Sequence, residues 1–261
     1  ATIAMSRKSR ELKAQGKDVI SLSLGEPDFN TPQFIKDAAT EAMENNFTKY
    51  MPVPGYDDLR ESISNKFKRD NNLNYDKDQI VVSTGAKQSI ANVVLTLINP
   101  GDEVIIPAPF WVSYIEIVKV AGGVPVLVNA GIDKDFKISG KDLENAITSK
   151  TKLMIFSTPC NPTGSVYNQV ELRDLADVIK KHPSLIVLCD EIYEHINFES
   201  KHESLAQFSD VYAQVVTVNG VSKAWAMTGW RLGYIGAPKA IASACSKVCL
   251  LYTSDAADDT P

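Results

Sequence analysis

Short apolar runs alternate with helical patterns through most of this chain, and this alternation constrains the fold more than any other feature. Helices are expected at about 85–98, 111–120 and 170–181. The intervening runs are almost wholly apolar, as strands buried on both faces of a parallel sheet are. Strands are expected at 79–83, 103–106, 124–128, 152–157, 185–190, 215–218 and 233–236. The sequence therefore predicts a three-layer α/β fold, in which helices cover both faces of a mostly parallel, seven-stranded sheet.

The first 46 residues break this pattern. A polar helix is expected at 5–15 and a strand at 19–23, followed by the turn-rich stretch 25–32. We interpret residues 1–46 as an N-terminal arm and part of a smaller α+β domain, and residues 47–248 as the large domain. An amphipathic helix is expected to begin near Asp57.

Composition narrows the classes of function. With 261 residues, 44% of them hydrophobic, the chain can bury a large core. A net charge of -5 with scattered Lys and Arg argues against nucleic acid as a partner. No apolar stretch approaches the ~18–20 residues that cross a membrane. The four cysteines lack CxxC spacing, so we expect reduced thiols in a cytoplasmic protein, and neither a zinc site nor any other metal site.

Polar residues that follow the expected strands mark the candidate site, because ligands of open α/β sheets bind beyond the carboxyl ends of strands. Gly85 permits a tight turn after the first strand, and the amides of Ala86 and Lys87 then open a helix. Such a helix end can bind a phosphate. Trp111 stands where the second strand gives way to a helix, so its indole can stack on a flat aromatic ligand.

Three further polar residues follow the next strands. Pro159 and Pro162 stiffen the backbone on either side of Asn161 and present its amide in a defined place. Asp190 ends an apolar strand, where a buried carboxylate needs a partner such as a protonated ring nitrogen. Tyr193 brings a phenol to the same place.

The most reactive candidate lies in the run from Asn219 to Tyr234. The amine of Lys223 attacks a carbonyl only if burial or a cationic neighbour lowers its pKa, and Arg231 can be that neighbour. Arg231 can also bind a phosphate, to which Tyr50 can donate a hydrogen bond. Together the candidates imply an aldehyde-bearing aromatic ring, a phosphate and a ring nitrogen, all of which pyridoxal phosphate provides.

Each candidate, taken singly, also has an ordinary structural explanation. These explanations are a plain turn at Gly85 or Asn161, a core contact for Trp111, a helix cap for Asp190, and solvated side chains for Tyr50 and Lys223. The agreement of all these places along the chain supports the interpretation.

The motifs, in this order and spacing, resemble the fold-type I, pyridoxal-phosphate-dependent aminotransferases of class I/II, particularly the bacterial aspartate aminotransferase-like branch. The resemblance extends from Ala1 to about Val248. It rests on Ser23-Leu-Gly-Glu-Pro-Asp-Phe29, Tyr50…Gly55, Gly85-Ala-Lys-Gln88, Asn161-Pro-Thr-Gly164, Asp190-Glu-Ile-Tyr193 and Ser222-Lys-Ala…Gly-Trp-Arg231. Any one of these motifs can arise by chance, but the whole set in this order would not.

This resemblance implies a role for each residue. Lys223 would bond covalently to the cofactor and then move a proton between substrate and cofactor, while Asp190 would keep the ring nitrogen protonated. Tyr193 and Asn161 would hydrogen-bond the phenolic oxygen of the cofactor, and Trp111 would stack on its ring. The phosphate would be held by Gly85, Ala86, Lys87, Ser222 and Arg231.

The resemblance also implies partners and a reaction. Tyr50 resembles the tyrosine that reaches the phosphate in the neighbouring subunit, which implies a homodimer, and Gly25 resembles a substrate contact, as do Trp111 and Asn161. The implied reaction transfers an amino group from an L-amino acid to a 2-oxo acid. Aspartate with 2-oxoglutarate is the first choice, and aromatic amino acids or prephenate stay open.

Two other functions are compatible with this scaffold. A β-lyase or decarboxylase would use the same lysine and aspartate, and a non-catalytic sensor domain would use neither for turnover. Against the sensor, residues 1–46 carry no basic helix-turn-helix pattern.

The C-terminal part departs from the family pattern. Family members continue for well over a hundred residues and supply an arginine that pairs with the substrate α-carboxylate, for which this chain has no match. The chain by itself is therefore expected to show poor solubility and little turnover. Residues 249–261 are not expected to continue the helix at 241–248 and, read as codons, resemble a transposase adapter used in sequencing libraries. We hypothesise that this tail is not native, and a genomic reading frame that encodes it would refute the idea.

Overall fold

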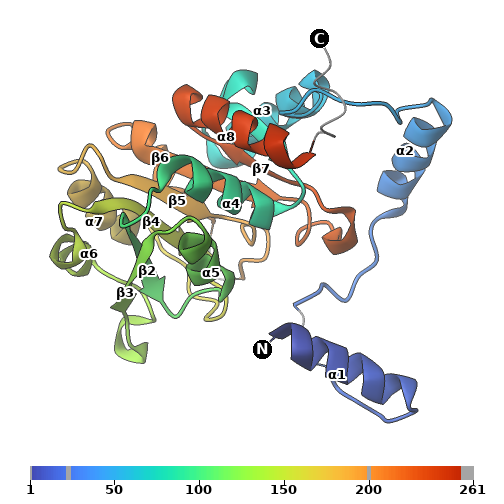
Figure 1. The fold of residues 1–261 in the computed structure, drawn as a ribbon, viewed down its shortest axis with the longest axis horizontal. Coiled ribbons are helices and arrows are strands. Elements are labelled where there is room, and N and C mark those ends of the chain that lie inside the picture. The colour runs from blue at the N-terminus through green and yellow to red at the C-terminus, as the bar shows by residue number, and fades with distance from the viewer. Residues whose placement is uncertain (1, 22–24, 199–200, 254–261) are drawn as a thin grey trace.

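The computed structural model describes residues 2–21, 25–198 and 201–253. Its centre is a seven-stranded sheet in the order β1-β7-β6-β5-β4-β2-β3 (Figure 1). The strands are β1 (Ile80–Ser83), β2 (Glu103–Ala108), β3 (Val124–Asn129), β4 (Thr151–Ser157), β5 (Ile186–Asp190), β6 (Val215–Gly220) and β7 (Gly233–Gly236). The pairs β2/β3, β2/β4, β4/β5 and β5/β6 are parallel, whereas β7 is antiparallel to β1 and β6. The predicted mostly parallel sheet is confirmed.

Helices form the two outer layers of the large domain. The α-helices are α1 (Thr2–Ala14), α2 (Gln33–Glu44), α3 (Asp57–Asn71), α4 (Ala86–Leu97), α5 (Ser113–Val120), α6 (Gly140–Ala146), α7 (Gln169–Ile179) and α8 (Lys239–Thr253). Short 3₁₀ helices are η1 (Lys77–Gln79), η2 (Ile132–Lys134), η3 (Leu205–Gln207), η4 (Tyr212–Gln214) and η5 (Thr228–Trp230). Residues of α4, α5 and α8 pack on one face of the sheet, and residues of α3, α6 and α7 pack on the other.

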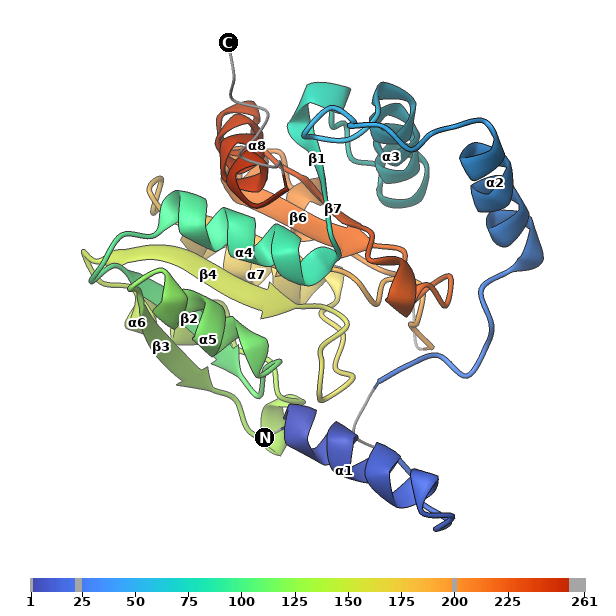
Figure 2. The same ribbon diagram turned by 45° about the vertical axis from the view of Figure 1, so that its right-hand side comes forward.

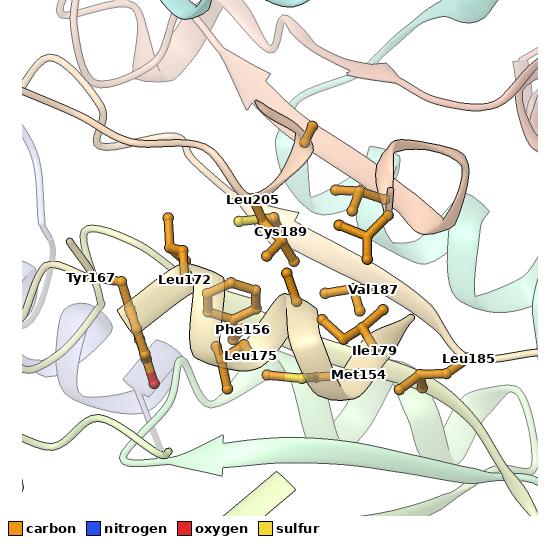
Figure 3. Packing of buried hydrophobic residues seen from close by; sticks show 14 of the residues in the cluster. Met154, Phe156, Tyr167, Leu172, Leu175, Ile179, Leu185, Val187, Cys189 and Leu205 are labelled. Atoms are coloured by element: carbon orange, nitrogen blue, oxygen red, sulfur yellow. The ribbon is translucent and has the colours of Figure 1, made fainter. Parts of the chain in front are cut away.

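A hydrophobic cluster fills each space between sheet and helices. The cluster under α7 joins Met154 and Phe156 of β4 with Leu172 and Leu175 of the helix (Figure 3). These helix residues recur at the spacing of one face of an α-helix, and the Asn168 side chain caps the first turn by accepting hydrogen bonds from two backbone amides. The sequence of α7 thus sets both where the helix begins and which face it buries.

Strand β5 separates two neighbouring acids. Successive side chains of a strand point to opposite faces, and Cys189 lies in the cluster under α7 while Leu188 lies in the cluster under α4 and α5. By the same alternation, the Asp190 side chain lies on the face of Leu188, and the Glu191 side chain lies on the face of Cys189. The alternation places the first acid on the side of the candidate site and the second behind it.

The N-terminal part differs from its prediction. Residues 19–21 of the expected strand have no regular structure, and positions 22 and 23 lie outside the described residues. Ile20 is 85% exposed, so its apolar side chain has no sheet face to cover. Helices α2 and α6 were not predicted, because α2 buries none of its residues and α6 is only seven residues long.

Helices α1 and α2 lie outside the three layers (Figures 1 and 2). Their assignment to an arm and a smaller domain stays a prediction. The expected end of the last helix at 248 is wrong, since α8 runs to Thr253 and Cys249 is buried. Residues 254–261 of the supposed non-native tail lie outside the described residues.

Across 2–21, 25–198 and 201–253, no helix is both long enough and apolar enough to span a lipid bilayer.

Candidate active site

The candidate site forms where the predicted residues meet beyond the carboxyl ends of β4, β5 and β6. Asn161 follows β4, Asp190 ends β5, and Lys223 follows β6. Strands β4, β5 and β6 are parallel neighbours in the sheet, so their carboxyl ends open at the same edge. The topology therefore brings together residues that are up to 62 positions apart in the sequence.

Asp190 is a buried carboxylate held by uncharged donors. Its Oδ2 accepts a hydrogen bond of 2.7 Å from the Tyr114 hydroxyl, and its Oδ1 accepts one of 3.3 Å from the Ile192 amide. Burial raises the pKa of Asp190 to about 6, although these two hydrogen bonds oppose the rise. The carboxylate is thus ionised at neutral pH but is not paired with a cation by these contacts.

Lys223 is half-buried in the loop that follows β6. Its ammonium donates a hydrogen bond to the carbonyl oxygen of Gly25 and lies 5.7 Å from the centre of the Tyr193 ring. Burial lowers the pKa of Lys223, Glu26 opposes this effect, and Arg231 adds to it. Both predicted causes of a lowered pKa are therefore present, and burial is the larger one.

A candidate anion site lies between the turn after β1 and Arg231. Gly85 has φ +88°, and a Cβ built there would lie 2.2 Å from Nη2 of Arg231, so only glycine fits. Arg231 donates to the carbonyl oxygens of Thr228, at 2.8 Å, and Thr84, at 3.4 Å, neither of which neutralises its charge. Helix α4 begins at Ala86, directly after this turn, so its first amides face the same place as the guanidinium.

Trp111 lies at the mouth of the site, in contact with Lys87 and Tyr114. The Lys87 ammonium lies 4.8 Å from the centre of the indole ring. The Tyr114 ring packs edge-on against the indole, with ring centres 5.6 Å apart. The side chain of Lys87 thus lies over Trp111, which leaves the backbone amide as the part of Lys87 that opens α4.

Asn161 and Tyr193 meet as predicted. The Asn161 amide nitrogen donates to the Tyr193 hydroxyl at 3.4 Å. Burial raises the pKa of Tyr193, and the nearby charge of Asp190 raises it further. Ser222 is buried immediately before Lys223.

Tyr50 is the predicted residue that lies apart from these groups. Its ring is 75% exposed, on the segment that joins α2 to α3. An exposed tyrosine is compatible with a contact to a second subunit, and that role stays a prediction.

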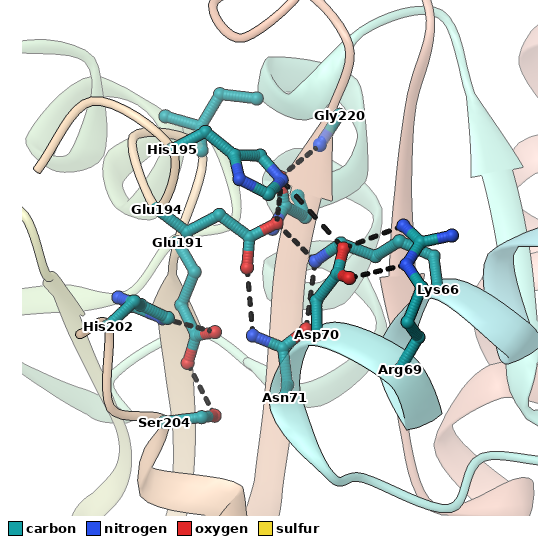
Figure 4. Close-up of polar contacts among 12 residues, drawn as sticks. Lys66, Arg69, Asp70, Asn71, Glu191, Glu194, His195, His202, Ser204 and Gly220 are labelled. Atoms are coloured by element: carbon teal, nitrogen blue, oxygen red, sulfur yellow. Dashed lines mark hydrogen bonds and ion pairs between the residues drawn. The ribbon is translucent and has the colours of Figure 1, made fainter.

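Sequence reasoning missed two features of the site. Tyr114 bonds directly to Asp190, and its position one helical turn after Trp111 was the available signal. The second is Glu191, which had no predicted role and is fully buried. Its carboxylate accepts hydrogen bonds from Ser204, at 2.6 Å, and from His202, at 2.9 Å (Figure 4).

Glu191, Glu194 and His202 also present possible metal ligands within 4.8 Å of one another. The carboxylate of Glu194, however, forms an ion pair with Lys66 and accepts a hydrogen bond of 2.8 Å from Asn71 (Figure 4). Glu191 and Glu194 thus already have hydrogen-bond and ion-pair partners within the protein. The cluster therefore serves as a buried polar network that joins α3 to the segment after β5.

Comparison with known proteins agrees with this fold and site. Residues 17–258 match the family described as aminotransferase class I and II, and the chain therefore belongs to that family. It is 50% identical to a probable aspartate/prephenate aminotransferase of Rickettsia bellii and 48% identical to an aspartate/prephenate aminotransferase of Nitrosomonas europaea, each over 256 residues and 97% of this chain. The aspartate aminotransferase of Thermus thermophilus, solved with maleate, matches 98% of this chain and 66% of its own with a TM-score of 0.94 and 40% identity.

The predicted resemblance is thus confirmed at the level of the family. The chain spans 64% of the length of each of the two bacterial relatives.

Proposed function

We propose that this chain carries the lysine-bearing part of a pyridoxal-phosphate-dependent aminotransferase. The observation that carries the proposal is the convergence of a half-buried Lys223, a buried Asp190 and an anion site at Arg231 on one edge of the sheet. A lysine, a carboxylate and an anion site match the aldehyde, the ring nitrogen and the phosphate of this cofactor.

The residues fit the cofactor on structural grounds. The turn at Gly85 leaves a hollow that a side chain would fill, and the Arg231 guanidinium lies against it with its charge still available. Asp190 is ionised above a pH of about 6 in a site where uncharged donors hold it, so a protonated ring nitrogen would supply the missing positive charge. When bound, pyridoxal phosphate supplies an electron sink for the substrate α-carbon.

The protein groups then have distinct tasks. The lowered pKa of Lys223 makes its amine neutral more readily, so the amine can attack an aldehyde and later accept and return the α-proton. Asp190 holds the proton on the ring nitrogen. Asn161 orients the Tyr193 hydroxyl, and this pair can hydrogen-bond the phenolic oxygen of the cofactor.

For substrate, we propose aspartate as the amino donor and a 2-oxo acid as the acceptor. The two bacterial relatives are named for aspartate and prephenate, so 2-oxoglutarate and prephenate are both proposed acceptors. Gly25 supports a substrate site beside Lys223, because its carbonyl oxygen already touches the lysine ammonium. We also propose a homodimer, in which the exposed Tyr50 reaches the partner, and a cytoplasmic location, which suits the thiols of Cys160, Cys189 and Cys245.

A panel of half-reactions on the full-length gene product tests this function. The purified protein is loaded with pyridoxal phosphate and mixed with single L-amino acids, and absorbance follows conversion of the cofactor from its aldehyde to its amine form. Aspartate and glutamate are expected to convert it, and 2-oxoglutarate or prephenate to restore it. Release of pyruvate and ammonia without conversion of the cofactor would instead assign a β-lyase.

A further inference from the structure

Tyr114 connects helix α5 to the acid of the candidate site. Its side chain is 1% exposed and lies in the hydrophobic cluster under α4 and α5, and its hydroxyl donates to Oδ2 of Asp190 at 2.7 Å. Burial raises the pKa of Tyr114 well above its usual value, and the charge of Asp190 raises it further. The hydroxyl therefore keeps its proton across the working pH range and always donates to the carboxylate.

The neighbouring strand places a second hydroxyl beside this hydrogen bond. Ser157 of β4 pairs with Asp190 of β5 in the register of the sheet, so the two side chains share one face. Ser157 lowers the pKa of Tyr114, in opposition to the larger effect of burial. A lower pKa makes the Tyr114 hydroxyl a stronger donor to Asp190.

The two oxygens of the Asp190 carboxylate accept hydrogen bonds of different length. Oδ2 of Asp190 receives the short hydrogen bond from Tyr114, whereas Oδ1 receives the longer one, 3.3 Å, from Ile192. A carboxylate oxygen has two lone pairs, so Oδ1 can accept a further bond from a ligand. The same Tyr114 ring packs edge-on against Trp111, 5.6 Å away between ring centres.

We propose that Tyr114 is a positioning residue of this site, whose hydroxyl keeps Asp190 ionised and turns Oδ1 toward the cofactor while its ring braces Trp111. The inference rests on the proposed pyridoxal phosphate function. It assigns a task to a residue that touches neither the cofactor-binding lysine nor the anion site.

The charges around Asp190 show why the hydroxyl matters. Glu191 raises the pKa of Asp190, and Cys189 and Tyr193 are the other ionisable groups whose charged forms interact with this carboxylate. Cys160 and Tyr114 line the same small cavity. All of these groups are acids, so the hydrogen bonds from Tyr114 and Ile192 are what oppose them. Without the Tyr114 hydroxyl, the pKa of Asp190 should rise above about 6 and the acid should become partly neutral near neutral pH.

The test measures cofactor affinity against pH for the full-length protein and its Tyr114→Phe variant. Affinity should fall as Asp190 takes up a proton, and the midpoint of that fall should lie about one pH unit higher in the variant. Tyr75→Phe is the matched control, because it also removes a buried tyrosine hydroxyl, one that lies 3.1 Å from Thr217 rather than at Asp190. Ser157→Ala should shift the midpoint in the same direction by less, and it replaces Tyr114→Phe if that variant does not fold.

A second readout separates the hydroxyl from the ring. Tyr114→Phe should retain the circular dichroism of the bound cofactor, whereas Tyr114→Leu should reduce it, because only the latter removes the brace on Trp111. Equal midpoints in wild type and Tyr114→Phe, or equal shifts in Tyr114→Phe and Tyr75→Phe, would overturn the inference. A wild-type protein that does not bind pyridoxal phosphate would overturn the proposed function itself.

Discussion

Two adjacent acids, Asp190 and Glu191, lie on opposite faces of the sheet and have opposite kinds of partner. Glu191 is fully buried and is matched by the His202 imidazole, at 2.9 Å, and the Ser204 hydroxyl. Asp190 is 5% exposed and is held by a tyrosine hydroxyl and a backbone amide. The chain thus pairs Glu191 with a histidine, whereas the printed contacts of Asp190 are both with uncharged donors.

The different partners of Asp190 and Glu191 have different consequences for the stability of the fold. A buried carboxylate without a cation costs folding free energy, and the raised pKa of Asp190 reports that cost. On the Glu191 side the positive partner is His202: burial lowers the pKa of His202, but the charge of Glu191 and its hydrogen bond to the imidazole, together with the charge of Glu194, outweigh burial and raise it overall. Within the described contacts, Glu191 has a cationic partner and Asp190 has only uncharged donors, which supports the proposal that a protonated ring nitrogen pairs with Asp190.

The largest expected effect comes from removing the reactive group on the Asp190 side. Lys223→Ala should lower amino-group transfer by the full-length protein about 10⁴-fold or more, because the covalent link and the proton transfer are both lost. Steady-state rates with aspartate and 2-oxoglutarate measure this loss. Lys119→Ala, which removes an exposed lysine paired with Glu116, should leave the rate unchanged.

The next largest effect belongs to the Glu191 side. His202→Ala should destabilise the protein by about 3–5 kcal/mol in urea unfolding, because it leaves the Glu191 carboxylate buried without its cation. The pKa of His202 is raised, so this stability is fully present below a pH of about 6.5 and is lost as pH rises through the folded pKa. His182→Ala breaks the exposed pair with Glu144 and should cost at most ~1 kcal/mol.

In contrast to His202→Ala, Asp190→Asn should stabilise the cofactor-free protein. The pKa of Asp190 is raised from 3.8 to about 6, so the stability linked to this group is present below pH 3.8 and is lost as pH rises through 6. The asparagine variant escapes that loss and should be more stable by roughly 3 kcal/mol at pH 8, and by less at pH 5. Unfolding midpoints at the two pH values measure the difference. A variant that is less stable than wild type at pH 8 would break the contrast between the two acids.

The smallest effect is expected from Tyr193→Phe. The Tyr193 hydroxyl accepts a long hydrogen bond, 3.4 Å, from Asn161, so its loss should hardly change the free energy of unfolding. Transfer activity should fall about tenfold, in line with the loss of one hydrogen bond to a charged group. A large change in stability without a change in activity would move Tyr193 to the structural side of the comparison.

Much of the large domain could be predicted because its strands are buried on both faces and therefore read as apolar runs. All seven strands are found within two residues of their expected bounds. The same signal failed at 19–21, where Val19 and Ile20 are apolar but no strand among the described residues pairs with them. Helix α2 was not predicted, and none of its residues is buried.

The candidate site could be predicted only in part, for a related reason. Lys223, Asp190 and Arg231 stand in short motifs whose chemistry can be read locally. The partnership of Glu191 with His202, and that of Tyr114 with Asp190, join residues from different segments, and only the packed fold brings them together. A sequence shows that an acid is present, but its partners decide whether it serves the fold or the reaction.

The central claim is that Lys223 is the residue that bonds to the cofactor, and chemical trapping tests it most directly. The full-length protein is incubated with pyridoxal phosphate, reduced with borohydride, digested and mapped by mass spectrometry. The account predicts that the added cofactor mass appears on the peptide containing Lys223. Labelling confined to another lysine, or no labelling, would contradict it.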